Sequence, residues 1–137
     1  MIQALTNRLL DFTPKSPDEN LPQAAVLILC YEKDDDLFFV MTERSNSLPS
    51  HPGEVAFPGG KREKQDKNLK QTALREASEE ISIDPAKVEI LGQLDPLESR
   101  FGLSVTPFVG ILKENFELEP NPDEVADIFY LPLSFFK

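Results

Sequence analysis

Three glutamates in one short segment are the residues of this sequence best suited to do chemistry. Glu76, Glu79 and Glu80 lie at positions i, i+3 and i+4, so on a helix their carboxylates would share one face within about one turn. Like charges this close repel one another and destabilise the helix unless a cation lies between them. Clustered carboxylate oxygens without soft ligands favour Mg²⁺ or Mn²⁺. A solvated acidic helix face is the alternative that the spacing leaves open.

A glycine-rich segment precedes this cluster. Phe57, Pro58, Gly59 and Gly60 predict a tight turn, where backbone amides and carbonyls can approach a ligand closely. A turn of this kind, connected to a helix that carries carboxylates, would place metal ions beside exposed backbone groups. The two segments together therefore indicate a site suited to a diphosphate.

The helix that must carry the glutamates is the most regular segment of the chain. Over residues 67–81 apolar residues recur every four positions, Asp66 is a candidate N-cap, and no glycine or proline interrupts the pattern. Apolar runs predict strands at 23–31, 37–42, around 55–57, 88–94, 105–112 and 125–130. Strands on both sides of one strong helix predict a mixed α/β domain.

The remaining segments are shorter. Residues 1–12 predict an amphipathic helix, 13–20 a polar linker, and 131–136 the beginning of a turn or helix. The acidic run 32–36 predicts a solvated hairpin turn, with calcium binding as the alternative.

Length and composition bound the function. A chain of 137 residues suits one domain. Its 14 basic and 24 acidic residues give a net charge of −10, which repels nucleic acid and anionic membranes. An anionic substrate would therefore need a divalent metal to bridge it to the protein. The single cysteine, Cys30, excludes a disulfide scaffold and a cysteine-based zinc site, and its apolar neighbours predict a buried thiol.

Nothing in the sequence indicates a membrane or a secretory pathway. The longest apolar run is far shorter than the roughly 20 residues that a membrane-spanning helix requires. Residues 1–8 lack the basic start and long apolar stretch of a signal peptide. We therefore expect a reducing, cytoplasmic location.

Residues 59–83 resemble the sequence box of the Nudix hydrolases, G-x(5)-E-x(7)-R-E-U-x-E-E-x-G-U, in which U is apolar. Gly60 and the run from Arg75 to Glu80 match its fixed positions. Asp66 stands where the box has glutamate, Ser82 stands where it has its last glycine, and the interval from Asp66 to Arg75 is one residue longer. The resemblance implies one Nudix domain over 1–137, folded as an α/β/α sandwich with a mixed β-sheet.

The same resemblance assigns roles to residues. It implies that Glu76, Glu79 and Glu80, with a backbone carbonyl of Gly60 or its neighbour, hold Mg²⁺ or Mn²⁺. Arg75 is expected to pair with one of these carboxylates and fix its rotamer. The catalytic residues are then expected to be Glu79, Arg75 and a general base from outside the box.

A second signature, L-L-T-x-R-S-x(3)-R-x(3)-G-x(3)-F-P-G-G, resembles the coenzyme A pyrophosphatases within this family. Its fixed positions are matched by Thr42, Arg44, Ser45, Gly53 and the run 57–60, whereas Pro49 replaces its second arginine. The resemblance covers roughly residues 23–135, and relatives continue with a further helix where this sequence ends. It implies that the substrate is bound by Arg44, Ser45, Gly53, Phe57 and Gly59. Lys61 and Arg62, beside the glycines, are weaker candidates for a phosphate contact.

The general base is the least determined residue. Glu124, just before the last predicted strand, matches a position that the superfamily uses for metal binding or base work, with a plain loop residue as the alternative. Glu98 is a weaker candidate. His51 is the only histidine, and its neighbours predict a turn residue that contacts substrate or solvent.

The predicted function is a metal-dependent hydrolase that cleaves the diphosphate of coenzyme A or acyl-coenzyme A. The products implied are 3′,5′-ADP and a 4′-phosphopantetheine. The alternatives are a Nudix hydrolase of another nucleoside diphosphate derivative, such as ADP-ribose or a dinucleotide, and a non-catalytic binding module. The expected partner is a small coenzyme A-like molecule, with no nucleic acid or membrane partner, and the resemblance allows a homodimer.

Overall fold

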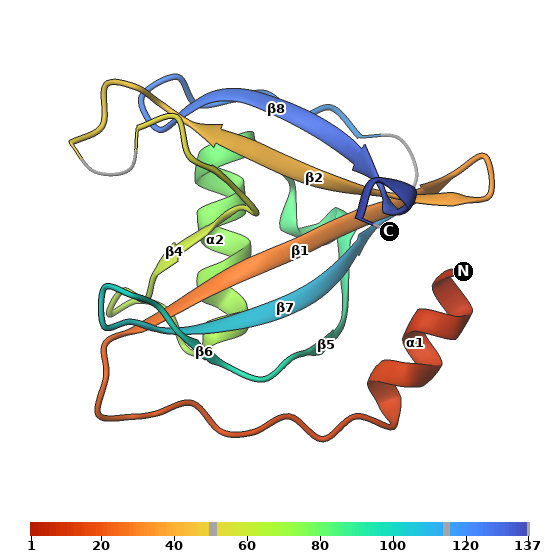
Figure 1. Cartoon of the computed structure of the whole chain (residues 1–137), viewed down its shortest axis with the longest axis horizontal. Coiled ribbons are helices and arrows are strands. Elements are labelled where there is room, and N and C mark those ends of the chain that lie inside the picture. The colour runs from red at the N-terminus through yellow and green to blue at the C-terminus, as the bar shows by residue number, and fades with distance from the viewer. Residues whose placement is uncertain (50–51, 114–115, 137) are drawn as a thin grey trace.

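The structure is a computed structural model that describes residues 1–49, 52–113 and 116–136. In the described residues, eight strands form one mixed sheet with the path β3-β2-β1-β7-β5 (Figure 1). The strands are β1 (Gln23–Lys33), β2 (Asp36–Arg44), β3 (Val55–Ala56), β4 (Gly59–Lys61), β5 (Val88–Gln93), β6 (Leu97–Glu98), β7 (Ser104–Leu112) and β8 (Val125–Pro132). The helices are α1 (Ile2–Leu10), α2 (Leu69–Ile81) and the short 3₁₀ segments η1 (Pro85–Lys87) and η2 (Leu133–Phe136).

The sheet opens between β1 and β2. These strands pair only next to their connecting turn, where residues 30–33 face 36–39. From Phe38 to Arg44, β2 pairs with β8, whereas β1 pairs in parallel with β7 and, at its first residues, with β4. Figure 1 shows the two halves diverging from the turn, with α2 behind them. Backbone from β3 and β4 enters this opening, which is where the candidate site forms.

The turn between β1 and β2 confirms the predicted hairpin. Asp34 and Asp35 have φ angles of 53° and 61°, values that aspartate tolerates better than most residues and that two-residue hairpin turns require.

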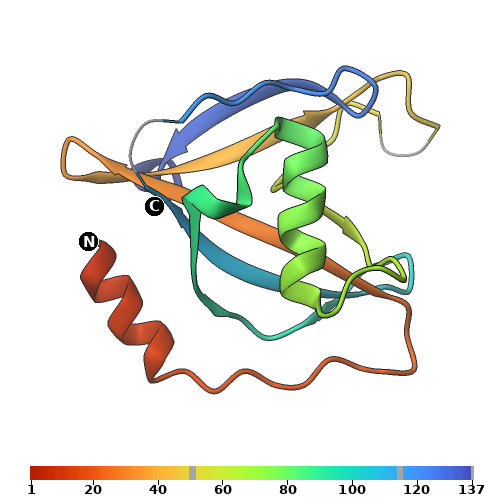
Figure 2. The same cartoon turned by 180° about the vertical axis from the view of Figure 1, so that it is seen from behind.

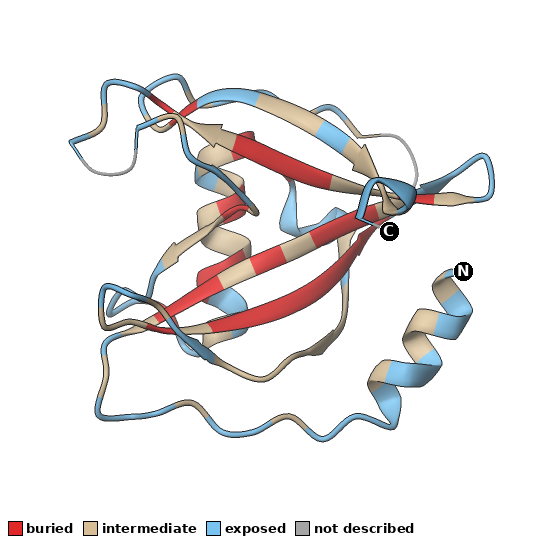
Figure 3. Cartoon of the chain, viewed as in Figure 1, coloured by how far each residue is buried: buried red, intermediate tan, exposed pale blue. Residues whose placement is uncertain are grey.

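The main core lies between α2 and the sheet. Ala73, Ala77 and Ile81 of α2 are fully buried against Leu27 and Leu29 of β1, and the small alanines let the helix approach the strand. Figure 3 shows the buried residues concentrated on β1, β7, β2 and the facing side of α2. Cys30 is fully buried, as predicted, and burial raises the pKa of its thiol to about 12.

The opposite face of the sheet carries a smaller cluster. It consists of Cys30, Leu37 and Ile111, with Ile2 and Leu5 of α1 and Leu133 of η2 packed against it. Helical elements therefore cover both faces, and the predicted α/β/α arrangement around a mixed sheet is confirmed. In the described part of the chain, no helix is long and apolar enough to span a membrane.

Two local predictions, one at the start of α2 and one at the glycines before it, were wrong. The helix begins at Leu69, and its N-cap is Asn68, whose side chain accepts a hydrogen bond from the Gln71 N–H at 2.9 Å. Asp66 instead pairs with Arg75, as described below. The segment Gly59–Lys61 is strand β4 rather than a tight turn, because its residues pair with Ala24–Val26 of β1.

The end of α2 explains one departure from the sequence box. Ser82 is the C-cap, with a left-handed φ of 61°, a conformation that favours glycine. Its hydroxyl donates to the Glu119 carbonyl at 3.1 Å, a contact that glycine could not make.

Candidate active site

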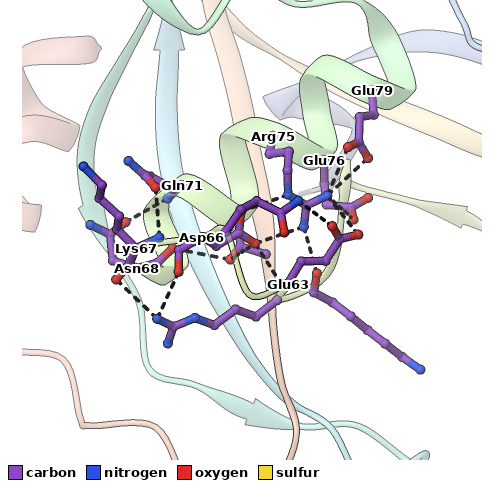
Figure 4. A network of polar contacts seen from close by, with 12 residues as sticks. Glu63, Asp66, Lys67, Asn68, Gln71, Arg75, Glu76 and Glu79 are labelled. Carbon is purple, nitrogen blue, oxygen red and sulfur yellow. Dashed lines mark hydrogen bonds and ion pairs between the residues drawn. The ribbon is translucent and has the colours of Figure 1, made fainter.

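Arg75 is the centre of a polar network on α2 (Figure 4). Its Nε donates to Asp66 Oδ1 at 2.9 Å and its Nη2 to Asp66 Oδ2 at 3.0 Å. Asp66 also accepts from the Thr72 hydroxyl at 2.9 Å and the Glu63 N–H at 3.0 Å. The carboxylate is 5% exposed, and its hydrogen bonds, first of all those from Arg75, hold its pKa well below the usual range.

The same guanidinium orients two of the three glutamates. Arg75 Nη1 donates to Glu76 Oε1 at 3.1 Å and to both oxygens of Glu79 at 3.2 Å. Its Nη2 also donates to the Lys61 carbonyl at 3.0 Å. Arg75 therefore pairs with carboxylates of the cluster, as expected, but its firmest partner is Asp66, which connects the loop after β4 to α2.

Gly60 of β4 lies in close contact with one of the three glutamates of α2. Gly60 lies against the carboxylate of Glu76, and a Cβ atom at this position would collide with it. Any larger residue at position 60 would therefore displace the Glu76 side chain. Burial raises the pKa of Glu76 to about 7, even though its contact with Arg75 lowers it.

Glu80 points toward the opening between β1 and β2. Its Oε1 accepts a hydrogen bond from the Gly59 N–H at 3.0 Å. Burial raises its pKa to about 8, and the charges of Glu76 and Glu124 add to this effect. Glu80 thus belongs to a group of partly buried carboxylates that repel one another.

A cavity of about 210 Å³ lies in this opening. It is bounded by Thr42, Arg44, Glu54, Ala56, Phe57, Gly59, Glu80, Glu124 and Val125. Five of the predicted site residues line it: Arg44, Phe57, Gly59, Glu80 and Glu124. The cavity wall thus brings one arginine together with three glutamates and the backbone of Gly59.

Backbone hydrogen bonds fix Glu124 in the cavity wall. Its N–H donates to the Asn121 carbonyl at 3.0 Å, and its carbonyl accepts from the Ser45 N–H at 2.9 Å. This contact lies next to the register shift between Glu43 and Arg44, where β2 ends. Glu124 Oε2 is buried and has no hydrogen-bond partner among the described residues, so this acceptor is available inside the cavity.

Ser45 and Gly53 shape the loop around Arg44. The Arg44 carbonyl accepts from the Gly53 N–H at 3.0 Å, and Gly53 has a left-handed φ of 73°. The Ser45 hydroxyl is buried and bonded to the Ser47 hydroxyl at 2.9 Å. Within the described residues, neither Ser45 nor Gly53 lines the cavity, so substrate contact by these two stays a prediction.

Other predicted candidates lie elsewhere. Glu79 is 47% exposed and outside the cavity wall. Glu98 is exposed on β6, next to β7, so it does not meet the carboxylates and the prediction of a base there is not supported. Arg62 lines other cavities, and Lys61 meets the site through its carbonyl. His51 lies outside the described residues.

The sequence pattern missed three contributors. The pattern predicts Asp66 as a helix cap and not as the partner of Arg75. It also gives no sign that Thr72 bonds to Asp66 or that Glu54 lines the cavity. A signal for the true cap existed in the spacing Asn68-x-x-Gln71, which is typical of a capping box. Nothing comparable marks Glu54, which reaches the cavity through the pairing of β3 with β2.

The carboxylates of this site form a donor set that suits a divalent cation, although they are engaged in other contacts. No group of three or more histidine, cysteine, aspartate or glutamate side chains in the described ranges is arranged ready to hold a metal. Arg75 and the Gly59 N–H engage the carboxylates of Glu76 and Glu80. Their mutual repulsion with Glu124, and the unsatisfied Oε2 of Glu124, nevertheless fit a hard cation among oxygen donors.

Comparisons with known proteins agree with this architecture. Residues 21–135 match the NUDIX domain family model. The chain is 50% identical over 123 residues to the uncharacterized Nudix hydrolase NudL of Photorhabdus laumondii, covering 88% of this chain and 64% of that protein. It is 43% identical over 112 residues to the mouse peroxisomal coenzyme A diphosphatase NUDT7, covering 82% of this chain and 48% of that protein.

A solved structure shares the fold. The Ap4A hydrolase of Caenorhabditis elegans, in a binary complex, superimposes with a TM-score of 0.69 at 20% identity, covering 85% of this chain and 83% of that one. The chain spans about half to two thirds of the length of the two curated relatives above. From the family match and these identities, we conclude that the chain belongs to the Nudix family.

Proposed function

We propose that this protein is a Mg²⁺- or Mn²⁺-dependent hydrolase that cleaves the diphosphate of coenzyme A or an acyl-coenzyme A. The products would be 3′,5′-ADP and a 4′-phosphopantetheine. The observation that carries the proposal is the convergence of Glu80, Glu124 and Arg44 on one cavity, with Glu76 close enough for its charge to raise the pKa of Glu80. The similarity to the mouse coenzyme A diphosphatase supports the choice of substrate.

In the proposed mechanism, water adds to one phosphorus and the bridging P–O bond breaks. A bound divalent cation, held by Glu76, Glu79 and Glu80 with the backbone of Gly60, would neutralise the diphosphate charge and lower the pKa of a bound water. Arg44, which lines the same cavity, would bind a phosphate oxygen. Glu124 Oε2, which has no hydrogen-bond partner in the part of the chain that the structure describes, would accept the proton of the attacking water.

Three further residues would position the carboxylates or the substrate without taking part in the reaction. Arg75 holds the carboxylates of Glu76 and Glu79 through hydrogen bonds, so it would limit their rotamers rather than contact the substrate. Gly59 would keep Glu80 directed into the cavity through the 3.0 Å hydrogen bond from its N–H. Phe57 would offer an apolar surface to the organic part of the substrate.

A second candidate is a hydrolase of another nucleoside diphosphate derivative, such as ADP-ribose or a dinucleotide. Pro49 favours it, because this residue removes the second arginine of the coenzyme A signature. The intact Arg-Glu-x-x-Glu-Glu run disfavours a non-catalytic module. With either candidate function, the ligand would be a small anion. A homodimer and a cytoplasmic location stay predictions.

The proposal is tested by incubating the purified protein with coenzyme A and ADP-ribose, with and without Mg²⁺, and identifying the products. We expect Mg²⁺-dependent release of 3′,5′-ADP and 4′-phosphopantetheine. The Glu80→Gln variant, prepared in parallel, controls for contaminating phosphodiesterases. If no phosphomonoester appears with any substrate, the hydrolase proposal is wrong; if ADP-ribose is hydrolysed faster, the second candidate replaces the first.

A further inference from the structure

A second and larger cavity, of about 670 Å³, lies away from the carboxylates. Its walls come from the end of α1, the linker that follows, β5 and the beginning of α2. Figure 2 shows the linker passing along β5 and the first turn of α2. The cavity shares no lining residue with the candidate active site, so its chemistry is separate from the proposed hydrolysis.

One wall of this cavity is apolar. It is formed by Leu9, Phe12, Leu69, Ile90 and Phe108. Phe12 is 40% exposed, and Leu69 and Ile90 are only partly buried. The residues therefore leave apolar surface that an organic chain could cover, which would be favourable by about 25 cal/mol per Å².

The rim of the cavity is cationic. Arg62, Lys67 and Lys70 line it, and no aspartate or glutamate is among the lining residues, although the chain holds 24 acidic residues. The Nζ atoms of Lys67 and Lys70 form no hydrogen bond or ion pair within the described ranges, and both residues are exposed. The rim is thus an unusual concentration of unmatched positive charge on an acidic protein.

Local structure fixes part of this rim. Arg62 Nη2 donates to the carbonyls of Asp66 and Lys67, each at 3.2 Å. These bonds hold the guanidinium beside the first turn of α2, whose N–H groups at Leu69 and Lys70 have no partner within the helix. The positive end of the helix dipole and the three cations therefore favour the same ligand charge.

We propose that this cavity binds a single-chain amphiphile with a carboxylate head group. The hydrocarbon chain would lie against the apolar wall, and the carboxylate would lie among Arg62, Lys67 and Lys70. A small inorganic anion would leave the apolar wall uncovered, whereas a neutral lipid would leave the cations unmatched. The volume lies within the range of about 300–1,000 Å³ that is typical of small-molecule sites.

Calorimetric titration of the whole protein with decanoate tests the proposal. Decanamide has the same chain without the charge, and inorganic phosphate has the charge without the chain. We expect saturable binding of decanoate that is about tenfold tighter than binding of either comparison ligand and that weakens as salt is raised. No saturable binding of decanoate, or phosphate binding of equal strength, would overturn the proposal.

Charge variants test the rim. Lys67→Ala combined with Lys70→Ala should weaken decanoate binding roughly tenfold, at a few-fold for each exposed ion pair. The matched control combines Lys33→Ala with Lys87→Ala, which removes the same charge from exposed positions outside the cavity. If both double variants weaken decanoate binding equally, the affinity depends on the net charge of the protein alone, and the proposed site would be rejected.

A pair of neighbouring variants tests the apolar wall. Phe12→Ala should weaken decanoate binding several-fold, whereas Leu10→Ala should not, since Leu10 is 74% exposed and does not line the cavity. Both side chains are exposed enough that the fold should survive, which a thermal melt checks. An unchanged affinity in Phe12→Ala, with a normal melt, would contradict the proposed position of the chain.

Discussion

Glu124 combines two properties that suit a general base. Its Oε2 atom is buried without a hydrogen-bond partner within residues 1–49, 52–113 and 116–136, and its backbone N–H and carbonyl both form hydrogen bonds. Glu124→Gln keeps the shape but cannot accept a proton, so we expect turnover to fall by roughly 10²- to 10⁴-fold with nearly unchanged metal affinity. Steady-state kinetics at several Mg²⁺ concentrations measures both quantities.

The metal series separates the two roles of Glu124. If the residue is a metal ligand, a higher Mg²⁺ concentration should restore much of the lost rate. The control is Glu98→Gln, since Glu98 is exposed on β6 and should behave like the unmodified protein. A Glu124→Gln enzyme that equals the unmodified protein at every metal concentration would make Glu124 a plain loop residue.

Glu80 links the chemistry of the site to its stability. Burial raises its pKa from 4.5 to about 8, so without metal its neutral form is the one that the fold favours. The stability that this preference contributes is fully present below pH 4.5 and is lost as the pH rises through about 8. Repulsion between Glu76, Glu80 and Glu124 should therefore weaken the metal-free protein most at alkaline pH.

Glu80→Gln removes this titration while keeping the shape. We expect the metal-free variant to melt at the same or a higher temperature than the unmodified protein at pH 8, while turnover falls by orders of magnitude. Added Mg²⁺ should raise the melting temperature of the unmodified protein more than that of the variant. Near-normal turnover of Glu80→Gln at saturating Mg²⁺ would contradict the assignment of the metal site.

At the scale of elements, the ion pair between Asp66 and Arg75 joins the loop after β4 to α2. Asp66 is buried and fully hydrogen-bonded, so Asp66→Asn would leave Arg75 with a poorer partner. We expect a loss of about 2–4 kcal/mol in the free energy of unfolding. Urea denaturation measures it, with Glu63→Gln as the control, because Glu63 is 52% exposed and 3.6 Å from Arg75.

The same pair predicts a pH dependence. The pKa of Asp66 is lowered in the folded protein, so the stability that it contributes is present above its unfolded pKa of about 3.9 and is lost as the pH falls below it. Between pH 5 and pH 3 the Asp66→Asn variant should therefore lose less stability than the unmodified protein. Parallel slopes of unfolding free energy over this interval would show that the pair carries no linked proton.

Elements were predicted where the chain repeats a local pattern. The four-residue period of α2 and the apolar run of β1 needed no tertiary information, and both elements lie within a few residues of their predicted bounds. The pairing of Asp66 with Arg75 spans nine residues and forms only when the loop folds against the helix. The strand at Gly59–Lys61 depends on pairing with β1, so its residues alone indicated a turn.

The candidate site was only partly predictable for the same reason, because its residues are even farther apart along the chain. Carboxylates on one helix could be grouped by their spacing, but Glu124 joins them only because β8 pairs with β2 beside the opening of the sheet. The family resemblance supplied that residue, whereas periodicity did not. Glu54 had neither signal, which is why only the structure places it in the cavity wall.

At the scale of the whole molecule, charge is distributed unevenly. The net charge of −10 would repel anionic ligands, yet each of the two cavities contains cations: Arg44 in the smaller one and Arg62, Lys67 and Lys70 in the larger. The proposed recognition of anions would therefore depend on a few local residues. The loss of even one such cation should be measurable in substrate preference.

The effect of losing one cation on substrate preference can be measured at Pro49. The signature of the coenzyme A pyrophosphatases has an arginine at this position, and Pro49 is exposed in the loop after β2. Coenzyme A carries a 3′-phosphate that 3′-dephospho-coenzyme A and ADP-ribose lack. A lost charged hydrogen bond is worth about 1.5–3 kcal/mol, or roughly 10- to 150-fold in affinity. We therefore expect coenzyme A to remain the preferred substrate of the three, but with a raised Michaelis constant.

Restoring the arginine makes this expectation specific. Pro49→Arg should lower the Michaelis constant for coenzyme A with little change in turnover, because the new contact would bind the ground state and the transition state alike. Pro49→Ala, which removes the proline without adding charge, separates the effect of the cation from that of a loosened loop. The deciding quantities are the specificity constants of the three proteins for the three substrates. If the unmodified protein prefers ADP-ribose, or if Pro49→Ala improves coenzyme A as much as Pro49→Arg does, the signature before the box reflects loop architecture and not recognition of the coenzyme.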